Sequence, residues 1–346
     1  MIDISFPGLG IDTFELDPVA FKIPIGDGIQ VRWYGILITL GLVLAILYCS
    51  WRSKQEGISF DNLLDMAIFT IIFAIIGARL YYVLTSLDSF HSLYDVIAIW
   101  NGGIAIYGAI IGGAITIYCV CRYKKIKVMK AYDMVVPAVM IGQIIGRWGN
   151  FFNCEAYGRL TDTPWRMCSP KIAKELFAWG QIDSTAYQSV LDGTLGAHPT
   201  FLYESLWNLV GFVIINLLYK KKKFDGQVFL MYITWYGFGR MLIESLRTDS
   251  LYVGVFRISQ VVGFVCFVVG GVLLIVNLTK ARKAALAEGD YTPSFMNTSL
   301  ETAAENDKDI KEEEASPNAT EDTATPIEEN ETDISDKLKN LFSEDE

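Results

Sequence analysis

Apolar residues in this chain are gathered in long blocks separated by polar connections, and do not recur with a helical or strand period. About 20 consecutive apolar residues is the length that a helix needs to cross the core of a bilayer. The pattern therefore predicts an all-α integral membrane protein with about seven transmembrane helices. The blocks are 31–50, 62–84, 96–120, 132–152, 199–219, 226–244 and 257–278.

Lysine and arginine predict the orientation of these helices. They gather in the connections 51–61, 121–131 and 220–225 and just after the last block, while the alternate connections hold fewer. Positively charged connections stay in the cytoplasm. We therefore expect the N-terminus outside, the C-terminus in the cytoplasm, and a small extracytoplasmic arm formed by residues 153–198. Residues 1–29 are acidic and interrupted by Pro and Gly, so no cleavable signal peptide is expected.

Charge divides the 346-residue chain into two parts. Residues 286–346 carry 19 acidic and 4 basic residues, whereas residues 1–285 carry 20 acidic and 25 basic residues. With 52% hydrophobic residues, the first part predicts a membrane-embedded domain. The second part is too polar to bury a core and predicts a disordered, acidic cytoplasmic tail. This balance implies no nucleic-acid partner.

The cysteines and histidines do not point to a metal or another cofactor. The six cysteines and two histidines lack the spacing of metal ligands. Most of the cysteines lie in or beside apolar blocks, where cysteine usually packs as a small side chain. Cys154 and Cys168 lie in the outer connection, where either a disulfide or two free thiols remains open.

Ionisable residues inside the blocks are the candidates for function, because charge in a membrane helix is costly. With the predicted orientation, Arg147, Arg240 and Glu244 lie near the outer ends of their helices, and Tyr34 and Glu204 lie near the outer starts of theirs. Arginine binds phosphate through two parallel hydrogen bonds and stays charged in a poorly hydrated site. This convergence predicts a site for an anionic ligand near the outer face, where the nearest anion is a phospholipid headgroup.

Structural roles compete with this interpretation. Asp65 and Asp133 are expected to be helix caps or loop partners, and Arg79 either reaches toward the headgroups or acts in the site. Arg147 and Arg240 have the structural alternative of pairing with Glu155 or Glu244. Glycines in the third block are expected to permit close helix packing: Gly102, Gly103, Gly108, Gly112 and Gly113.

Two motifs are specific. The first, GRWGNFFNCEAYG, covers Gly146–Gly158, and the second, YGFGR, covers Tyr236–Arg240. Together with RWYG at 32–35, GARL at 77–80, WNGG at 100–103 and HPTFLYE at 198–204, they resemble the phosphatidylglycerol–prolipoprotein diacylglyceryl transferases. The resemblance spans most of residues 30–280 and excludes the tail.

The resemblance implies an enzyme of the bacterial cytoplasmic membrane, with its site toward the outer face, that acts in the first step of lipoprotein maturation. It would transfer the diacylglyceryl group of phosphatidylglycerol to the lipobox cysteine of a prolipoprotein and release glycerol phosphate. The residues implied to bind substrate are Tyr34, Arg147, Asn150, Glu155, Tyr236 and Arg240. Those implied to be catalytic are Tyr107, Arg147, Arg240 and Glu244.

One position departs from the family pattern. Many members carry histidine in the third helix where this chain has Tyr107, and a neutral phenol is a poor base. Tyr107 is therefore expected to orient the thiol or the phosphate by hydrogen bonding. His198 is either a substitute base or a structural residue.

Two other functions compete with that of a transferase. A lipid flippase or transporter predicts polar residues in the inner half of the membrane or an inverted repeat. An intramembrane protease needs a Ser–His pair or paired aspartates, and the sequence contains no Gly-x-Ser-Gly motif.

Overall fold

The computed structural model describes residues 1–24, 28–90, 92–250 and 252–288, so the predicted tail lies almost entirely outside the described residues. Helices make up most of the described chain. Six of them are long and apolar enough to cross a membrane. They are α1 (Trp33–Glu56), α2 (Phe60–Thr85), α4 (Ile106–Tyr123), α5 (Val128–Asn153), α8 (Thr200–Tyr219) and α10 (Ile258–Glu288).

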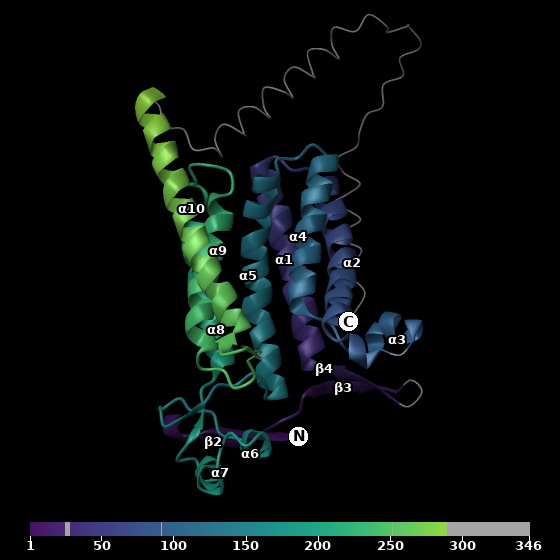
Figure 1. Cartoon of the computed structure of the whole chain (residues 1–346), viewed down its shortest axis with the longest axis vertical. Helices are drawn as coiled ribbons and strands as arrows, with labels where there is room; N and C mark the ends of the chain where they lie inside the picture. Colours follow the sequence, from purple (N-terminus) through teal and green to yellow (C-terminus); the bar gives the residue numbers. More distant parts are fainter. Residues whose placement is uncertain (25–27, 91, 251, 289–346) are drawn as a thin grey trace, which may run out of the picture. The chain divides into compact units, whose positions relative to one another are not determined.

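The remaining predicted block forms α9 (Gln227–Glu244), a helix of 18 residues with Arg240 and Glu244 in its last turns. These charges and several aromatic residues make α9 less apolar than its neighbours. It packs along α10 and also contacts α8 and α5, while α1 packs on α5 and α2 on α4 (Figure 1). Leucine and isoleucine side chains of α1, α2 and α10 remain exposed, as expected for surfaces that face lipid.

The predicted start of the third helix is wrong. Instead of a helix from residue 96, the chain forms a short helix α3 (Leu93–Ile97) and a 3-10 turn, and α4 begins only at Ile106. Gly102 and Gly103 interrupt the helix with φ angles of +89° and +76°, which favour glycine. Tyr107 is consequently the second residue of α4 and does not lie part of the way along a longer helix.

Arg79 holds this interrupted segment in place. Its guanidinium donates hydrogen bonds to the backbone oxygens of Val96 (2.9 Å), Gly102 (2.6 Å) and Gly103 (2.6 Å). The residue is only 9% exposed, and its donors are directed at protein carbonyl groups. Arg79 is therefore a structural residue, and neither of its two predicted alternatives describes it.

Close packing of α2 on α4 depends on glycine. A Cβ atom on Gly108 would lie 2.2 Å from the backbone oxygen of Gly77, and one on Gly112 would lie 2.6 Å from that of Phe73. Both distances are too short for any side chain. The packing role predicted for Gly108 and Gly112 is confirmed, whereas Gly102 and Gly103 lie in the turn before the helix.

The connections α1–α2, α4–α5 and α8–α9 lie at one end of the helices, which we call the Lys-rich end because it carries Lys124–Lys127 and Lys220–Lys223 (Figure 1). Lys222 is fully buried there, with its Nζ 2.8 Å from Glu56 Oε1 and 3.2 Å from Asp133 Oδ2. A buried charge is tolerated when it is paired in this way. The sequence prediction did not foresee this cluster, because it placed Glu56 and Lys222 in solvated connections.

Two aspartates at the same end have the structural roles predicted for them. Asp133 of α5 accepts hydrogen bonds from the backbone N–H groups of Gly226 and Phe229, both at 2.9 Å, and so caps the start of α9. Asp65 of α2 pairs with Lys124 at 2.7 Å, in the connection after α4.

Residues 153–198 fold into an arm at the end of the helices opposite the Lys-rich end (Figure 1). It contains β5 (Leu160–Thr161), α6 (Pro170–Ala178), α7 (Ser184–Leu191) and β6 (Gly196–Ala197). The N-terminal hairpin, β1 (Ile2–Phe6) and β2 (Ile11–Leu16), packs on the arm through paired backbone hydrogen bonds between Ser5 and Cys168 and through the buried Ile4.

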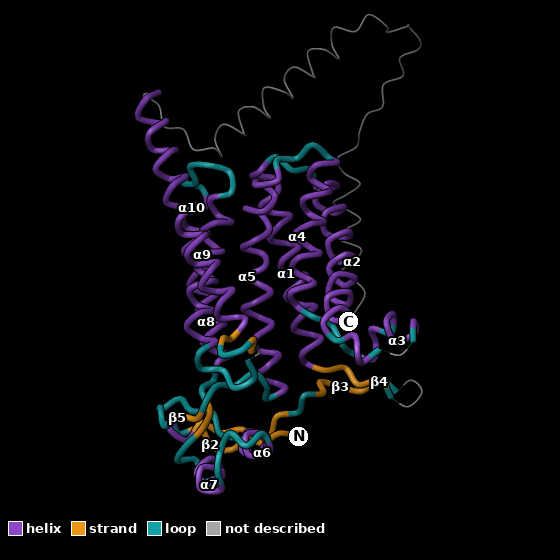
Figure 2. Tube along the Cα trace, viewed as in Figure 1, coloured by secondary structure: helices purple, strands orange, loops and turns teal. Residues whose placement is uncertain are grey.

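Short antiparallel hairpins were not predicted (Figure 2). Besides the β1–β2 hairpin, β3 (Val19–Ile23) pairs with β4 (Ile29–Arg32) before α1, and β7 (Tyr252–Val253) pairs with β8 (Phe256–Arg257) before α10. In the arm, β5 and β6 form an antiparallel pair although α6 and α7 lie between them in the sequence. The fold is therefore mostly helical, with small two-stranded sheets.

Cys154 and Cys168 are free thiols, so of the two alternatives left open for them the disulfide is not formed. Cys168 Sγ lies 3.2 Å from the backbone oxygen of Leu195. Burial raises the pKa of the Cys154 thiol to about 11 and also raises that of Cys168. Both cysteines consequently pack as neutral side chains in the core of the arm.

Candidate functional site

One carboxylate lies at the centre of the polar residues that were predicted to converge. Glu204, in the second turn of α8, is 4% exposed. It forms a short ion pair with Arg147 Nη2 of α5 and lies 3.1 Å from Arg240 Nη1 of α9. Arg247 Nη1, in the loop after α9, lies 3.3 Å from the same carboxylate. Three arginines from separate segments thus surround one side chain; we call this the arginine cluster.

Further carboxylates balance the arginine cluster. Glu244 is 1% exposed, and its Oε2 lies 2.6 Å from Arg240 Nη2, although this contact lacks the alignment of a hydrogen bond. Asp249 receives two hydrogen bonds from Arg247, at 3.0 and 2.7 Å. The arrangement satisfies the requirement that buried charges be paired. Counted by formal charge, three arginines face three carboxylates, so the cluster is not a simple cationic patch.

Arg147 differs from the other two arginines in its unused donors. Arg247 engages Nε, Nη1 and Nη2 with carboxylates. In the part of the chain that the structure describes, Arg147 makes an ion pair through Nη2 alone, which leaves Nε and Nη1 without a partner. Its side chain is also the most exposed of the three, at 23% against 14% for Arg240 and 11% for Arg247. An added anion is therefore best accommodated at Arg147.

The first motif positions Asn150 and Glu155 beside each other. At the end of α5, Cys154 and Ala156 have positive φ angles of +47° and +55°, which turn the chain back on itself. Glu155 Oε1 accepts hydrogen bonds from Asn150 (3.0 Å) and Asn153 (3.2 Å). The alternative pairing of Arg147 with Glu155 is not observed, whereas that of Arg240 with Glu244 is confirmed.

The two predicted tyrosines adjoin the arginine cluster. The Tyr34 ring packs on Gly149, where a Cβ atom would lie 2.5 Å from Tyr34 Cδ2, so only glycine fits. The charges of Arg147 and Glu155 both act on the Tyr34 phenol. Tyr236 of α9 interacts electrostatically with Arg147, Glu204 and Arg240.

Tyr107 connects α4 to α10. Its hydroxyl lies 2.9 Å from Ser259 Oγ, and its ring centroid lies 6.2 Å from that of Tyr81. Its hydrogen-bonded hydroxyl fits an orienting role.

His198 has the contacts of a structural residue. Its Nδ1 lies 3.0 Å from the Tyr203 hydroxyl, which also accepts a 2.5 Å hydrogen bond from Trp165 Nε1. Burial lowers the pKa of His198, so the neutral ring predominates at neutral pH. Of the two roles left open for it, these contacts favour the structural one.

Sequence reasoning did not include Arg257 or Ser259 in the site, and it counted Glu204 among the converging residues without assigning it a partner. Arg257, 8% exposed, donates a short hydrogen bond to the backbone oxygen of Glu244 and thereby fixes the end of α9. A signal existed for Glu204, because it is an acid one turn inside an apolar block. Nothing in the local pattern indicated that it would contact three arginines at once.

Comparison with known proteins identifies similar chains. A family model described as prolipoprotein diacylglyceryl transferase matches residues 18–276. A protein of Finegoldia magna is 41% identical over 267 residues, covering 77% of this chain and 97% of its own length. Proteins of Clostridium perfringens (40% over 272 residues, covering 78% of this chain and 97% of its own length) and Limosilactobacillus reuteri (41% over 272 residues, 77% and 92%) are similar to the same extent. All three are named phosphatidylglycerol–prolipoprotein diacylglyceryl transferases.

Proposed function

Because this chain belongs to the prolipoprotein diacylglyceryl transferase family, we propose that it transfers the diacylglyceryl group of phosphatidylglycerol to a cysteine thiol of a prolipoprotein. The sulfur forms a bond to the glycerol carbon as that carbon's bond to the phosphate oxygen breaks. The products are a thioether and glycerol phosphate, and the thiol proton is released. The observation that carries this proposal is the arginine cluster, in which Arg147 keeps donors for an anion.

Phosphate binding is the role that we propose for Arg147 and Arg240. The phosphodiester of the lipid carries one negative charge, and the glycerol phosphate that leaves carries more. Donors held in place before the reaction stabilise this developing charge. Glu204 and Glu244 keep Arg240 fixed, while the free Nε and Nη1 edge of Arg147 is directed at the phosphate. Asn150, Glu155, Tyr34 and Tyr236 complete the substrate site in this proposal.

Thiol activation follows from the same charges. A free cysteine with a pKa near 8.5 is only a few per cent thiolate at neutral pH, and nearby cations increase that fraction. We assign no dedicated base to this chain. Tyr107, whose hydroxyl is held by Ser259, orients the thiol or the leaving phosphate by a hydrogen bond. Glu244 keeps the Arg240 guanidinium in position through their ion pair.

Changing Tyr107 to phenylalanine is expected to slow transfer about tenfold, since one hydrogen bond typically contributes about 1–1.5 kcal/mol. Ser259→Ala should produce a similar loss, because it removes the same contact. Tyr81→Phe is the matched control, since its ring lies beside Tyr107, and it should retain the native rate. The measurement is transfer of labelled diacylglyceryl to a lipobox peptide at equal protein levels. An inactive Tyr107→Phe protein would instead assign a proton-transfer role to the phenol.

The orientation proposed for the chain places the N-terminus, the arm and the arginine cluster outside a bacterial cytoplasmic membrane. Its support is the Lys-rich end, which lies opposite the arm. A cysteine introduced at the exposed position Gln188 of α7 should react with a membrane-impermeant maleimide in intact cells. One introduced at the exposed position Lys221 should react only after the cells are opened. The unmodified chain measures the background from native cysteines, and the reverse pattern would refute the orientation.

A further inference from the structure

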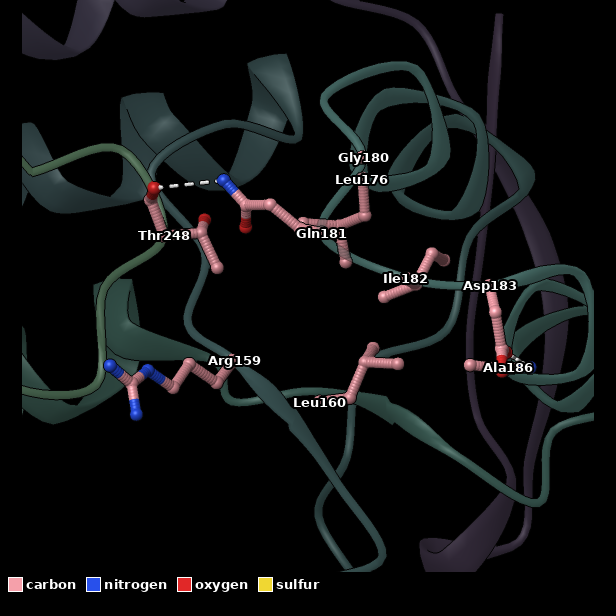
Figure 3. A pocket seen from close by; sticks show the side chains of 9 residues that line it. All are labelled: Arg159, Leu160, Leu176, Gly180, Gln181, Ile182, Asp183, Ala186 and Thr248. Carbon is pink, nitrogen blue, oxygen red and sulfur yellow. Dashed lines mark hydrogen bonds between the residues drawn. The ribbon is translucent and has the colours of Figure 1, made fainter.

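A pocket of about 670 Å³ opens in the arm, formed by residues that the proposed chemistry does not use (Figure 3). Its apolar wall comes from Leu160 of β5, Leu176 of α6, Ala186 of α7, and Ile182 in the connection between α6 and α7. Leu160 points toward Ile182 across the opening. A volume in this range is typical of pockets that bind ligands.

The polar part of the pocket is sparse and mixed in sign. Gln181 Nε2 donates a 3.3 Å hydrogen bond to the backbone oxygen of Thr248, and Asp183 Oδ1 accepts one from the N–H of Ala186 at 2.8 Å. Arg159 contributes an exposed guanidinium that has no side-chain partner among the described residues. Beside its apolar wall, the pocket therefore has one cation, one anion, one side-chain amide and one hydroxyl, which belong to Arg159, Asp183, Gln181 and Thr248.

The pocket shares a chain segment with the arginine cluster. Thr248 forms part of the pocket, and the preceding residue, Arg247, contacts Glu204. Hydrogen bonds fix this segment to the arm: Arg159 N–H donates to the backbone oxygen of Leu246 at 2.7 Å, and Thr248 Oγ1 donates to that of Tyr157 at 3.1 Å. An extended chain advances about 3.5 Å per residue. A few residues of a bound peptide therefore suffice to connect the pocket to the arginine cluster.

We propose that this pocket binds the peptide segment that follows the acceptor cysteine of the prolipoprotein, an inference that rests on the proposed function. The apolar part of a signal peptide occupies the membrane, so the residues after the cysteine emerge beside the arm. The apolar wall takes a side chain of this segment. The mixed polar groups at the rim bind its backbone.

The charges of the pocket favour a peptide over a phosphate. A phosphate dianion is bound by several cationic donors together, as the arginine cluster offers. Here a single arginine is offset by Asp183, and four apolar residues form the wall. That combination matches a neutral backbone with an apolar side chain.

The test compares two peptides of one prolipoprotein sequence with the full-length enzyme in micelles that contain phosphatidylglycerol. The short peptide ends one residue after the cysteine, and the long peptide continues for about ten residues. We expect the native enzyme to show a KM for the long peptide about tenfold below that for the short one, the factor expected for one well-buried apolar side chain.

Ala186→Trp fills the pocket and should raise the KM of the long peptide to that of the short one, while the short peptide keeps its native KM. Gln188→Trp is the matched control, since it lies two residues further along α7 on the opposite, exposed face, and it should change neither value. Ile182→Ser removes part of the apolar wall and carries the test if Ala186→Trp does not fold.

Equal KM values for the two peptides with the native enzyme would overturn the pocket proposal. The pocket proposal would also be overturned if Ala186→Trp changed the KM values of the two peptides equally. A change in the KM for phosphatidylglycerol alone would overturn it too, and would assign the pocket to lipid. Binding of a fluorescent long peptide without lipid donor separates the two proposals. If the long peptide binds, Ala186→Trp weakens that binding, and neither peptide accepts a diacylglyceryl group, then the proposed function is refuted and the pocket proposal is upheld.

Discussion

Replacing Arg147 or Arg240 with alanine is expected to reduce diacylglyceryl transfer about 100-fold or more. Removing one preorganised donor that stabilises charge in a transition state typically has an effect of this size. Arg147→Ala removes the unused donors that we propose to bind the phosphate. Arg240→Ala removes a guanidinium that Glu204 and Glu244 hold in a fixed position for the same role. The measurement is the rate of transfer from labelled phosphatidylglycerol to a lipobox peptide, with membrane levels of each protein compared.

Two further variants make this result specific. Arg147→Lys should restore activity only in part, because lysine has a single charged nitrogen and cannot bind phosphate with two parallel hydrogen bonds. Arg122→Ala is the matched control, since Arg122 lies exposed at the Lys-rich end of α4, and it should leave transfer unchanged. Near-native rates for both Arg147→Ala and Arg240→Ala would mean that these arginines only pair with carboxylates and do not bind phosphate.

Lys222→Ala is expected to lower the free energy of unfolding by about 3–5 kcal/mol, the usual effect of breaking a buried ion pair. The substitution leaves the buried carboxylates of Glu56 and Asp133 without their shared cation. Tyr219 and the backbone N–H groups at the start of α9 still donate to these carboxylates, but they carry no charge. The measurement is reversible unfolding in mixed micelles.

Lys221→Ala is the control for this experiment, because the Lys221 side chain is exposed. Removing it should change the free energy of unfolding by no more than about 0.5 kcal/mol. A similar small change for Lys222→Ala would show that the buried cluster does not hold α1, α5 and the α8–α9 connection together.

Parts of the site were predictable because they depend on residue type and position along a helix. Arg240 and Glu244 lie four residues apart, so their contact follows from helix geometry alone. The capping role of Asp133 was likewise foreseen as one of few ways to satisfy an acid near a helix end. Glu204, in contrast, was counted among the converging residues, but its contacts with three arginines from two helices and a loop were not foreseen.

The start of α4 was mispredicted for a related reason. Residues 96–105 are apolar enough to continue a helix, but their backbone oxygens are bound by Arg79 of α2, and two glycines allow the turn. The arm's reliance on the N-terminal hairpin was also not foreseen, since Ser5 and Cys168 are far apart in the sequence.

The sequence by itself determined which segments are apolar helices, which end of them is Lys-rich and which motifs hold the arginines, because block length, charge and motif are properties of adjacent residues. Only the tertiary structure decided which carboxylate pairs with which arginine, where α4 begins and that a pocket adjoins the cluster. These features depend on how helices distant in the sequence are rotated and packed against one another. That packing is fixed by contacts such as Gly77 on Gly108 and Tyr34 on Gly149. The residues adjacent to either partner in the sequence do not indicate which distant residue it will contact.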